Sequence, residues 1–362
     1  MRSLIAKLLR SQSRFKSYLG KRTDDIGYRQ LIAHGDSSYR LSVYEKKSIK
    51  ELWGSIIPHP MSIGYSFYEM IKASGRFAPE YLPSAYYMPY VYEALNDVAG
   101  LKVLGHKALQ PILFKDCRQP RNILSKISGI FYDEKFNPVD IDLALEILKR
   151  ESTDMIIKPA SESSMGRGIG LIKSNSNKDV EGLLSLSDFV IQEKVSQSSI
   201  LSNLNPTSLN CIRITTLNIN NRVTAVNTAI KIGAKGSIVD NIGSGSGGMM
   251  IGVSENGILK GYGYHVDGTL VRSGDIVDFA GIKIPNFEDA IDMTCKMHRF
   301  IPSMGIIGWD IALDSQDRPV LIEANSFWPG ITIEQVAAGP IFGDRTHEVV
   351  EFIEKNENNK TK

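Results

Sequence analysis

Three oxygen-bearing side chains near the C-terminus have the types and the spacing of a magnesium site. Asp310 lies in the segment Gly-Trp-Asp-Ile-Ala-Leu, and Glu323 and Asn325 follow in Leu-Ile-Glu-Ala-Asn. Alternate side chains of a strand share one face, and a polar turn at residues 314–317 folds the Asp310 strand back beside the other two. Mg2+ prefers a few carboxylate or carbonyl oxygens and completes its shell with water and phosphate. The pattern predicts a hairpin that holds a metal-nucleotide, with an ordinary hairpin of solvated polar residues as the alternative.

A lysine at the end of a predicted strand precedes a glycine-rich loop. The strand ends in Ile-Ile-Lys-Pro at Lys158 and Pro159, and small residues follow from Ser161 to Gly170. Glycines let backbone amides approach an anion closely, and consecutive amides form a cradle for phosphate. The loop lacks the Gly-Lys-Ser/Thr of a Walker loop, and a strand rather than a helix follows, which excludes both that site and a Rossmann site. A plain hairpin turn is the alternative.

Two further segments have residue types suited to a nucleotide. The strand from Phe189 ends among polar residues at Gln192 to Val195, a linker that can offer backbone donors and acceptors to adenine. In the next strand, Asn210 and Arg213 bracket an apolar run, and a guanidinium there either pairs with an acid or holds phosphate oxygens bidentately.

Lys231 ends the following strand, and residues 233–252 contain seven glycines around Asp240. So much glycine favours a mobile lid or a site that substrate approaches, with a disordered connector as the alternative.

Short strands and helices are expected to position these residues. Apolar runs bounded by turn residues predict strands at 154–158, 168–173, 189–195, 211–220, 222–233, 249–253 and 258–264. Helices are predicted at 138–150, with Asn137 as the cap, and at 287–300, capped by Asn286. Because strands and helices are mixed rather than regularly alternating, the pattern favours an α+β fold.

The chain is long enough for several lobes. At 362 residues it is expected to divide into a helical N-terminal region (1–94), a central lobe with the glycine-rich loop (95–190), a C-terminal lobe with the metal hairpin (191–355) and a disordered tail (356–362). The formal charge of +2 is too small to indicate a nucleic-acid partner. Cys117, Cys211 and Cys295 lack a metal-ligand spacing and are expected to be free thiols.

Residues 1–22 contain seven Lys or Arg residues and no acid, with apolar residues at near-helical spacing. They predict a basic amphipathic helix, which either lies on an anionic membrane surface or packs against its own domain. No apolar run approaches the roughly 20 residues that span a bilayer, and the N-terminus lacks a signal-peptide pattern. We therefore expect a cytoplasmic protein, with peripheral contact to the inner face of the membrane as an open alternative.

Taken in order, these segments resemble the ATP-grasp superfamily, and most closely its sugar-transfer-associated branch, from about Leu95 to Phe352. The resemblance implies two α+β lobes that grip ATP. It implies that Lys107 and Lys158 meet the phosphates, and that a loop containing Ser163, Ser164, Met165, Gly166 and Gly168 closes above them. It further implies that adenine faces Gln192, Glu193, Lys194 and Val195. Asp310, Glu323 and Asn325 would bind two Mg2+ ions, or Mn2+, and the catalytic positions would be Arg213, Lys231 and Asn210.

Three departures from the family pattern affect these assignments. His106 stands where many relatives have an Asp, and no acid follows the hinge closely enough to be assigned to ribose. Lys231 stands where relatives often carry arginine.

The chemistry implied by the resemblance is carboxylate activation, in which ATP phosphorylates a carboxylate and an amine displaces the phosphate to form an amide. The branch name suggests a substrate of polysaccharide or glycoconjugate assembly, such as a uronic acid amidated by an amino acid. Two alternatives stay open: a kinase-like phosphotransferase, and a non-catalytic nucleotide-binding scaffold at a membrane surface. The oligomeric state is not predicted.

Overall fold

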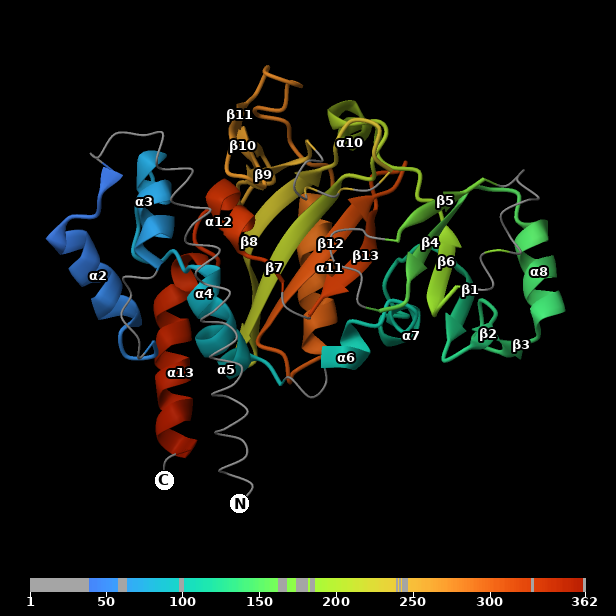
Figure 1. The fold of residues 1–362 in the computed structure, drawn as a ribbon, viewed down its shortest axis with the longest axis horizontal. Helices are drawn as coiled ribbons and strands as arrows, with labels where there is room; N and C mark the ends of the chain where they lie inside the picture. The colour runs from blue at the N-terminus through green and yellow to red at the C-terminus, as the bar shows by residue number, and fades with distance from the viewer. Residues whose placement is uncertain are drawn as a thin grey trace.

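The computed structural model describes residues 39–57, 64–97, 101–161, 168–173, 182, 186–238, 240, 242, 247–326 and 329–360. The predicted basic helix at 1–22 and the loop residues Ser163, Ser164, Met165 and Gly166 lie outside these ranges, so those predictions stand untested. Two antiparallel sheets with flanking helices form the molecule, which agrees with the expected α+β class. Figure 1 shows the smaller sheet on the right and the larger sheet at the centre.

The smaller sheet has six strands in the order β3-β2-β1-β6-β4-β5. Their bounds are β1 Asn122–Ile127, β2 Ile130–Tyr132, β3 Pro138–Val139, β4 Met155–Pro159, β5 Gly170–Ile172 and β6 Phe189–Glu193. Helix α8 (Ile141–Arg150) packs against β1 and β2 and buries Ala144 and Leu148. We call this unit the six-stranded lobe.

The predicted cap of α8 is wrong by three residues. Pro138 belongs to β3, and the helix begins after Asp140, whose side chain accepts a hydrogen bond of 2.8 Å from the Leu143 N–H. An Asp at the N-cap satisfies one of the free amides of the first turn, which Asn137 is too far away to do. Pro138 pairs with Tyr132 on β2, so the helix cannot begin there.

The larger sheet has seven strands in the order β11-β10-β9-β8-β7-β12-β13. Their bounds are β7 Cys211–Ile219, β8 Arg222–Ile232, β9 Met249–Val253, β10 Leu259–His265, β11 Leu270–Arg272, β12 Ile306–Leu313 and β13 Pro319–Asn325. The short helix α10 (Ser199–Leu204) precedes β7. We call this unit the seven-stranded lobe. The predicted boundary at 190/191 falls inside β6, because the linker between the lobes starts only where that strand ends.

Two helices cover opposite faces of the seven-stranded sheet. Helix α11 (Phe287–Arg299) packs on β7, β8, β12 and β13, and its His298 contacts Thr216. Helix α12 (Thr332–Ala338) packs on β8, β9 and β10, and its Glu334 accepts a hydrogen bond from Thr215. Thr215 and Thr216 are neighbours on β7, so the two contacts lie on opposite sides of the sheet. The cleft described below opens on the α12 side.

Asn286 precedes α11 as predicted, but its side chain makes no capping hydrogen bond. It adopts a left-handed conformation with φ of 47°, and its Nδ2 donates to the Asp317 carbonyl oxygen at 2.9 Å. Asn286 therefore ties α11 to the turn of the β12–β13 hairpin.

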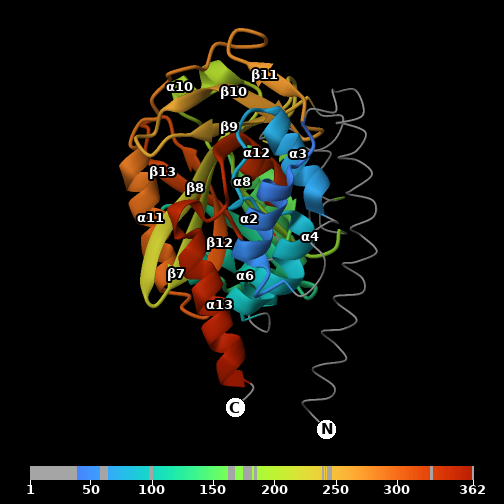
Figure 2. The ribbon, with the colours of Figure 1, turned by 90° about the vertical axis from the view of Figure 1, so that its left-hand side faces the viewer.

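Short helices form the N-terminal region, as its aromatic-rich sequence predicted. They are α2 (Val43–Trp53), α3 (Tyr65–Ala73), α4 (Ser84–Tyr86), the π-helical turn η3 (Tyr87–Tyr92) and α5 (Glu93–Leu95), followed by α6 (Leu101–Leu104) and α7 (Gln110–Leu113). Figure 2 shows α2, α3 and α4 beside the C-terminal helix, on the side of the molecule away from the six-stranded lobe.

This region is bonded to the segment that follows β13. The buried side chain of Gln335 accepts a hydrogen bond of 3.0 Å from the Leu82 N–H and donates one of 2.8 Å to the Leu82 carbonyl oxygen. The hydroxyls of Ser84 and Thr332 lie 2.5 Å apart, and Tyr92 donates to the Ser326 carbonyl oxygen. These hydrogen bonds fix α12 and the segment before it to the N-terminal region.

The C-terminus differs from the prediction. After the 3-10 turn η4 (Gly343–Arg345), helix α13 runs from Thr346 to Lys360 and includes residues 356–360 of the expected disordered tail. Val349, Val350 and Ile353 are buried and anchor the helix. Glu and Lys are good helix formers, so a polar end can extend a helix that is already held by packing.

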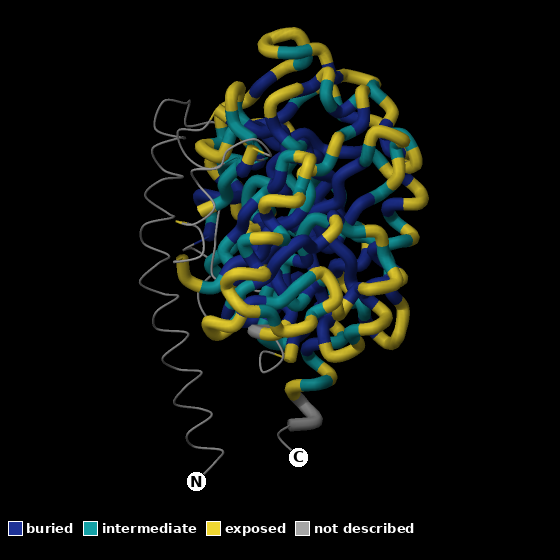
Figure 3. The backbone as a smooth tube through the Cα atoms, turned by 90° about the vertical axis from the view of Figure 1, so that its right-hand side faces the viewer, coloured by how far each residue is buried: buried dark blue, intermediate teal, exposed yellow. Residues whose placement is uncertain are grey.

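Figure 3 shows the buried residues in the interior of the molecule and the exposed ones mostly on its outer loops. The buried core includes apolar residues of both sheets and of the N-terminal helices. All three cysteines are free thiols, as expected. Among the described residues, no helix is both long and apolar enough to cross a membrane.

Candidate active site

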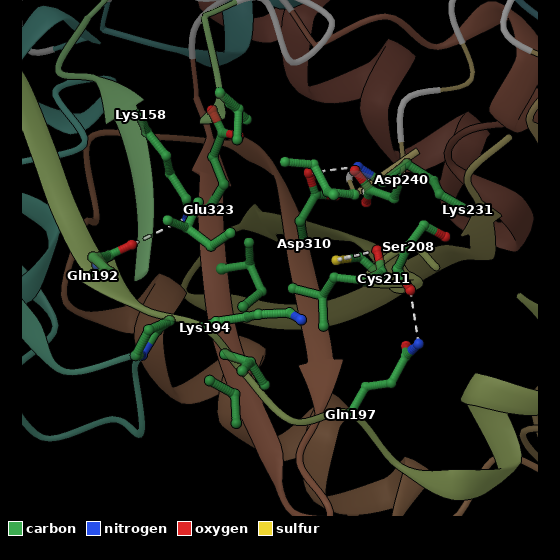
Figure 4. Close-up of a pocket in the computed structure, with 18 of the residues that line it drawn as sticks. Lys158, Gln192, Lys194, Gln197, Ser208, Cys211, Lys231, Asp240, Asp310 and Glu323 are labelled. Atoms are coloured by element: carbon green, nitrogen blue, oxygen red, sulfur yellow. Dashed lines mark hydrogen bonds and ion pairs between the residues drawn. The ribbon is translucent and has the colours of Figure 1, made fainter. Parts of the chain in front are cut away.

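A cleft of about 1630 Å³ lies between the two lobes and is lined by both of them. Most of the predicted site residues line it. They are Lys107, Lys158, Gln192, Glu193, Lys194, Val195, Arg213, Lys231, Asp310, Glu323 and Asn325. Figure 4 shows Lys158 and Gln192 on one side, Asp310, Asp240 and Lys231 on the other, and Glu323 and Lys194 between them.

The two lobes meet at an ion pair in this cleft. Lys107 Nζ lies 2.7 Å from Glu323 Oε1, and the lysine side chain is 8% exposed while the glutamate is 29% exposed. The Lys107 backbone is fixed by a 2.7 Å hydrogen bond from its N–H to the Ala160 carbonyl oxygen, next to the end of β4. Glu323 is on β13, so the pair joins the acidic hairpin to the six-stranded lobe.

Lys158 lies beside this pair on β4. Its Nζ donates a 3.0 Å hydrogen bond to Gln192 Oε1 on the neighbouring strand β6. Burial lowers the pKa of Lys158, and the nearby Glu323 carboxylate partly offsets that effect. Two cations at the end of β4 therefore face one partly exposed carboxylate, an arrangement that has room for an additional anion.

Strand register creates a second charged group. Asp310 on β12 is the register partner of Arg213 on β7 and of Glu323 on β13, which places the three side chains in one row. Arg213 holds Asp310 through Nε at 2.7 Å and through one terminal nitrogen at 3.2 Å. Lys231 Nζ adds a third contact at 2.8 Å.

These charges determine the protonation of the group. Burial would raise the pKa of Asp310, but Arg213 and Lys231 outweigh it and hold that pKa far below its usual range. Burial would lower the pKa of Lys231, and Asp240 and Asp310 raise it instead. Asp310, Arg213 and Lys231 are therefore all ionised at neutral pH.

The predicted magnesium ligands are close together. Asn325 Nδ2 lies 2.9 Å from Asp310 Oδ2. Glu323 on β13 is the register partner of Asp310 on β12. Two carboxylates and an amide are hard oxygen donors that suit Mg2+ when phosphate and water supply the remaining positions. The donor set fits the ion once the Asn325 amide turns to present its oxygen. Among the residues that the structure describes, no group of three or more His, Cys, Asp or Glu side chains forms a closed metal cage.

The sequence matches the family described as sugar-transfer associated ATP-grasp over residues 95–351. The chain belongs to the sugar-transfer associated ATP-grasp family. A search of curated proteins finds no match to the chain.

Several solved structures are distantly similar. The N5-carboxyaminoimidazole ribonucleotide synthetase of Thermotoga maritima is 11% identical, with 63% of this chain and 43% of that chain covered and a TM-score of 0.36. The biotin carboxylase domain of the 2-oxoglutarate carboxylase of Hydrogenobacter thermophilus, solved with MgADP and bicarbonate, is 11% identical, with 72% and 47% covered and a TM-score of 0.43. The VanG D-Ala:D-Ser ligase of Enterococcus faecalis is 11% identical, with 69% and 61% covered and a TM-score of 0.44.

This chain spans less than two thirds of the length of each of these three solved chains. Their TM-scores below 0.5 carry no argument about its activity. The ATP-grasp assignment rests on the family match and agrees with the two antiparallel sheets.

Asn210 differs from its predicted place in the ATP-grasp cleft. It is fully buried and does not line the cleft. Its Nδ2 donates to the carbonyl oxygens of Leu201 and Asn205 at 2.8 and 2.9 Å, and its Oδ1 accepts from Ser208 Oγ at 2.7 Å. Asn210 thus fixes the loop before β7, a contact pattern that its position in the sequence did not reveal.

The linker residues Gln192 to Val195 line the cleft where the chain passes from one lobe to the other. The N–H groups of Glu193 and Lys194 donate at 3.0 Å to the carbonyl oxygens of Arg121 and Asp154. The backbone N–H groups of Glu193 and Lys194 are therefore already bonded within the protein. Val195 is the next residue of the linker. The Lys194 ammonium points into the cleft (Figure 4).

Gly168 is next to the phosphate-loop region but is not itself part of the cleft lining. Its φ of +76° is in the left-handed region, and a Cβ there would come within 2.7 Å of Pro159 Cγ. Both observations require glycine at this position. Gly168 therefore shapes the turn into β5 rather than facing the cleft.

His106 and Glu334 complete the site. His106 lines the cleft, its Nδ1 is buried without a hydrogen-bond partner among the described residues, and burial lowers its pKa. Glu334 is 1% exposed, accepts a hydrogen bond from Thr215 and has Oε2 3.9 Å from an Arg213 nitrogen. Burial raises the pKa of Glu334 to about 7. Sequence analysis missed Glu334, because an acid in the first turn of a helix is common and gives no distinguishing signal.

Proposed function

We propose that the chain is an ATP-dependent ligase that joins a carboxylate to an amine through an acyl-phosphate intermediate. The observation that carries the proposal is the Lys107–Glu323 ion pair, because it brings the cations of the six-stranded lobe to the acidic hairpin of the other lobe. A nucleotide triphosphate that replaces Glu323 as the partner of Lys107 would have Lys158 on one side and the metal ligands on the other.

The chain's own residues would act mainly by charge. Lys107 and Lys158 would bind the phosphates, and Arg213 and Lys231 would stabilise the negative charge that develops on the transferred phosphoryl group. Mg2+ held by Asp310, Glu323 and Asn325 would neutralise phosphate charge and align the leaving group. The proposal includes two bound metal ions, either Mg2+ or Mn2+.

The two steps balance without a protein nucleophile. A carboxylate oxygen of the substrate forms a bond to the γ-phosphorus, and the bond from that phosphorus to the leaving ADP oxygen breaks. The amine nitrogen then bonds to the acyl carbon, phosphate leaves with its bonding electrons, and the amine releases a proton. A closed cleft would protect the acyl phosphate from water.

The family description, "sugar-transfer associated", supports a proposal for the substrate class. We propose a sugar carboxylate, free or linked to a glycan of polysaccharide or glycoconjugate biosynthesis, as the activated group and an amino acid as the amine.

The experiment is an assay of ADP release with ATP and Mg2+ across uronic acids and amino acids, combined with mass spectrometry of the products. The expected result is ADP release that depends on both substrates and a product with one new amide bond. A phosphorylated product formed without any amine would overturn the ligase and identify a kinase-like phosphotransferase.

A further inference from the structure

The side chains that line the cleft change from charged to apolar along the seven-stranded sheet. Passing from β13 to β9, it presents Glu323, Asp310, Arg213, Lys231 and then Met250. The first four side chains are charged, whereas Met250 is apolar and buried. Lys231 and Met250 are register partners on β8 and β9, so charged and apolar surfaces meet between neighbouring strands.

Further apolar side chains line the cleft on elements that surround Met250. Ile238 comes from the connection between β8 and β9, and Val266 directly follows β10. Pro329 precedes α12 and Ile333 lies in the first turn of that helix, which packs on β8, β9 and β10. We call these five residues, Ile238, Met250, Val266, Pro329 and Ile333, the apolar end of the cleft.

Hydrogen bonds outside the cleft hold part of this end in place. The Asn205 side chain donates to the Gly233 carbonyl oxygen at 2.7 Å, and the Gly236 N–H donates to Thr207 Oγ1 at 2.9 Å. The Leu209 N–H donates to the Ile238 carbonyl oxygen at 3.4 Å. The connection that carries Ile238 is thereby tied to the loop before β7, which gives a largely preformed wall.

The cations next to this wall retain donors for an anion. Lys231 has three N–H donors, and its described partners Asp310 and Asp240 lie at 2.8 and 2.7 Å. Arg213 uses Nε and one terminal nitrogen for Asp310, and its other terminal nitrogen is 3.9 Å from Glu334. A ligand carboxylate can therefore approach both cations from the open side of the cleft.

We propose that the apolar end binds the amine substrate as an α-amino acid with an aliphatic side chain. Its carboxylate lies beside Lys231, and its side chain lies against Met250 and Ile333. Lys231 and Met250 are register partners on neighbouring strands, so one small ligand can contact the lysine through its carboxylate and the methionine through its side chain. A polar side chain would lose water there without gaining a partner. The inference rests on the proposed function in taking the ligand to be the amine of the ligase reaction.

Equilibrium binding tests this without turnover. The protein, with Mg2+ and a non-hydrolysable ATP analogue, is titrated calorimetrically with leucine and valine and with their polar isosteres asparagine and threonine. We expect each aliphatic amino acid to bind about 10-fold to 100-fold more tightly than its isostere. Equal affinities, tighter binding of the polar members, or no binding of any of the four would overturn the proposal.

A pair of matched substitutions locates the contact. Ile333→Thr adds a hydroxyl to the cleft wall in the first turn of α12, and it should weaken leucine binding about 10-fold while the affinity for the ATP analogue stays unchanged. Ile141→Thr makes the same change in the first turn of α8, outside the cleft lining, and should alter neither affinity. Unchanged leucine binding by a folded Ile333→Thr protein would contradict the assignment.

The outcomes separate this inference from the ligase proposal. Selective leucine binding without ADP release from any carboxylate would support the apolar end and count against the ligase. Amide formation with polar amino acids only would support the ligase and overturn the aliphatic preference.

Discussion

Lys107 Nζ and Glu323 Oε1 are 2.7 Å apart at the junction of the two lobes. The contact joins a lysine that precedes the whole six-stranded sheet to a glutamate on the last strand of the other sheet. Because Glu323 is partly exposed and lines the cleft, a phosphate and a metal can reach this pair and rearrange it. Its disruption should therefore affect activity more than folding.

Glu323→Gln should retain the fold and lose turnover. Glutamine can still accept a hydrogen bond from Lys107, so the free energy of unfolding should change by about 1 kcal/mol or less. Loss of one carboxylate that holds the metal should lower kcat by about 100-fold or more. ADP release and urea unfolding measure the two effects, with the exposed Glu351→Gln on α13 as the control. An unchanged kcat in Glu323→Gln would contradict the role of this carboxylate in turnover, whereas no ADP release from either wild type or variant would favour a scaffold over either enzyme.

Asp310→Asn should destabilise the protein strongly. Asp310 is 4% exposed and is the shared partner of Arg213 and Lys231, so its neutralisation leaves two buried cations less well compensated. Removing one partner of a buried ion pair costs about 3–5 kcal/mol. Denaturant unfolding should show this loss, whereas Asp142→Asn on the exposed face of α8 should change stability by about 0.5 kcal/mol or less. Similar values for the two variants would refute the structural role of Asp310.

Asn210→Ala tests the role that the structure gives to this residue. The substitution removes two buried donor contacts and one acceptor contact, so we expect a loss of about 2–4 kcal/mol in the free energy of unfolding. At a temperature where the variant is folded, kcat should stay within about threefold of wild type, since Asn210 does not reach the cleft. A loss of kcat by about 100-fold without destabilisation would restore the catalytic assignment.

His298 should make stability fall in mild acid. Burial lowers its pKa to about 4, below the ordinary value of 6.5, while its Nε2 donates to the Met304 carbonyl oxygen and its Nδ1 accepts from Thr216. Between pH 6.5 and 4 the unfolded state binds a proton that the native state does not bind, so the free energy of unfolding decreases as the pH falls. The effect amounts to roughly 3 kcal/mol. Urea titrations of wild type and His298→Gln at pH 7 and 4.5 should show a smaller loss in the variant; parallel losses would be the contrary result.

Glu334 should act in the opposite direction. Burial raises its pKa to about 7 from 4.5, so the native state binds a proton that the unfolded state has released over that interval. Its contribution to stability is therefore lost as the pH rises from 4.5 to 7. Relative to wild type, Glu334→Gln should be more stable at pH 8 than at pH 5, by roughly 3 kcal/mol. Equal differences at both pH values would show that Glu334 does not titrate as inferred.

Local patterns were sufficient for the hairpins. The β7–β8 and β12–β13 pairs have apolar runs joined by short polar turns, and alternation correctly placed Glu323 and Asn325 on one face. The order of strands was not predictable in this way. β12 lies beside β7, and this non-local pairing brings Arg213 to Asp310. No periodicity in either segment encodes that neighbour.

The same reason explains the missed residues. Glu334 contacts Arg213 only because the first turn of α12 brings its carboxyl to Thr215 on β7. Asn210 is outside the cleft because its side chain bonds to carbonyl oxygens of α10 and the loop after it. Polarity alone also misled the assignment of the C-terminal tail, whose helix is fixed by apolar residues earlier in α13.

The bonds between Leu82 and Gln335, and between Ser84 and Thr332, have a practical consequence for anyone who shortens this chain. The family match starts at residue 95, which invites a cut at that point. Such a cut would remove both hydrogen bonds between the buried Gln335 amide and Leu82 and uncover the helix that carries Ile333 and Glu334. The boundary of shared ancestry and the boundary of autonomous folding therefore differ here, and a shortened chain has to retain the segment that carries Leu82 and Ser84.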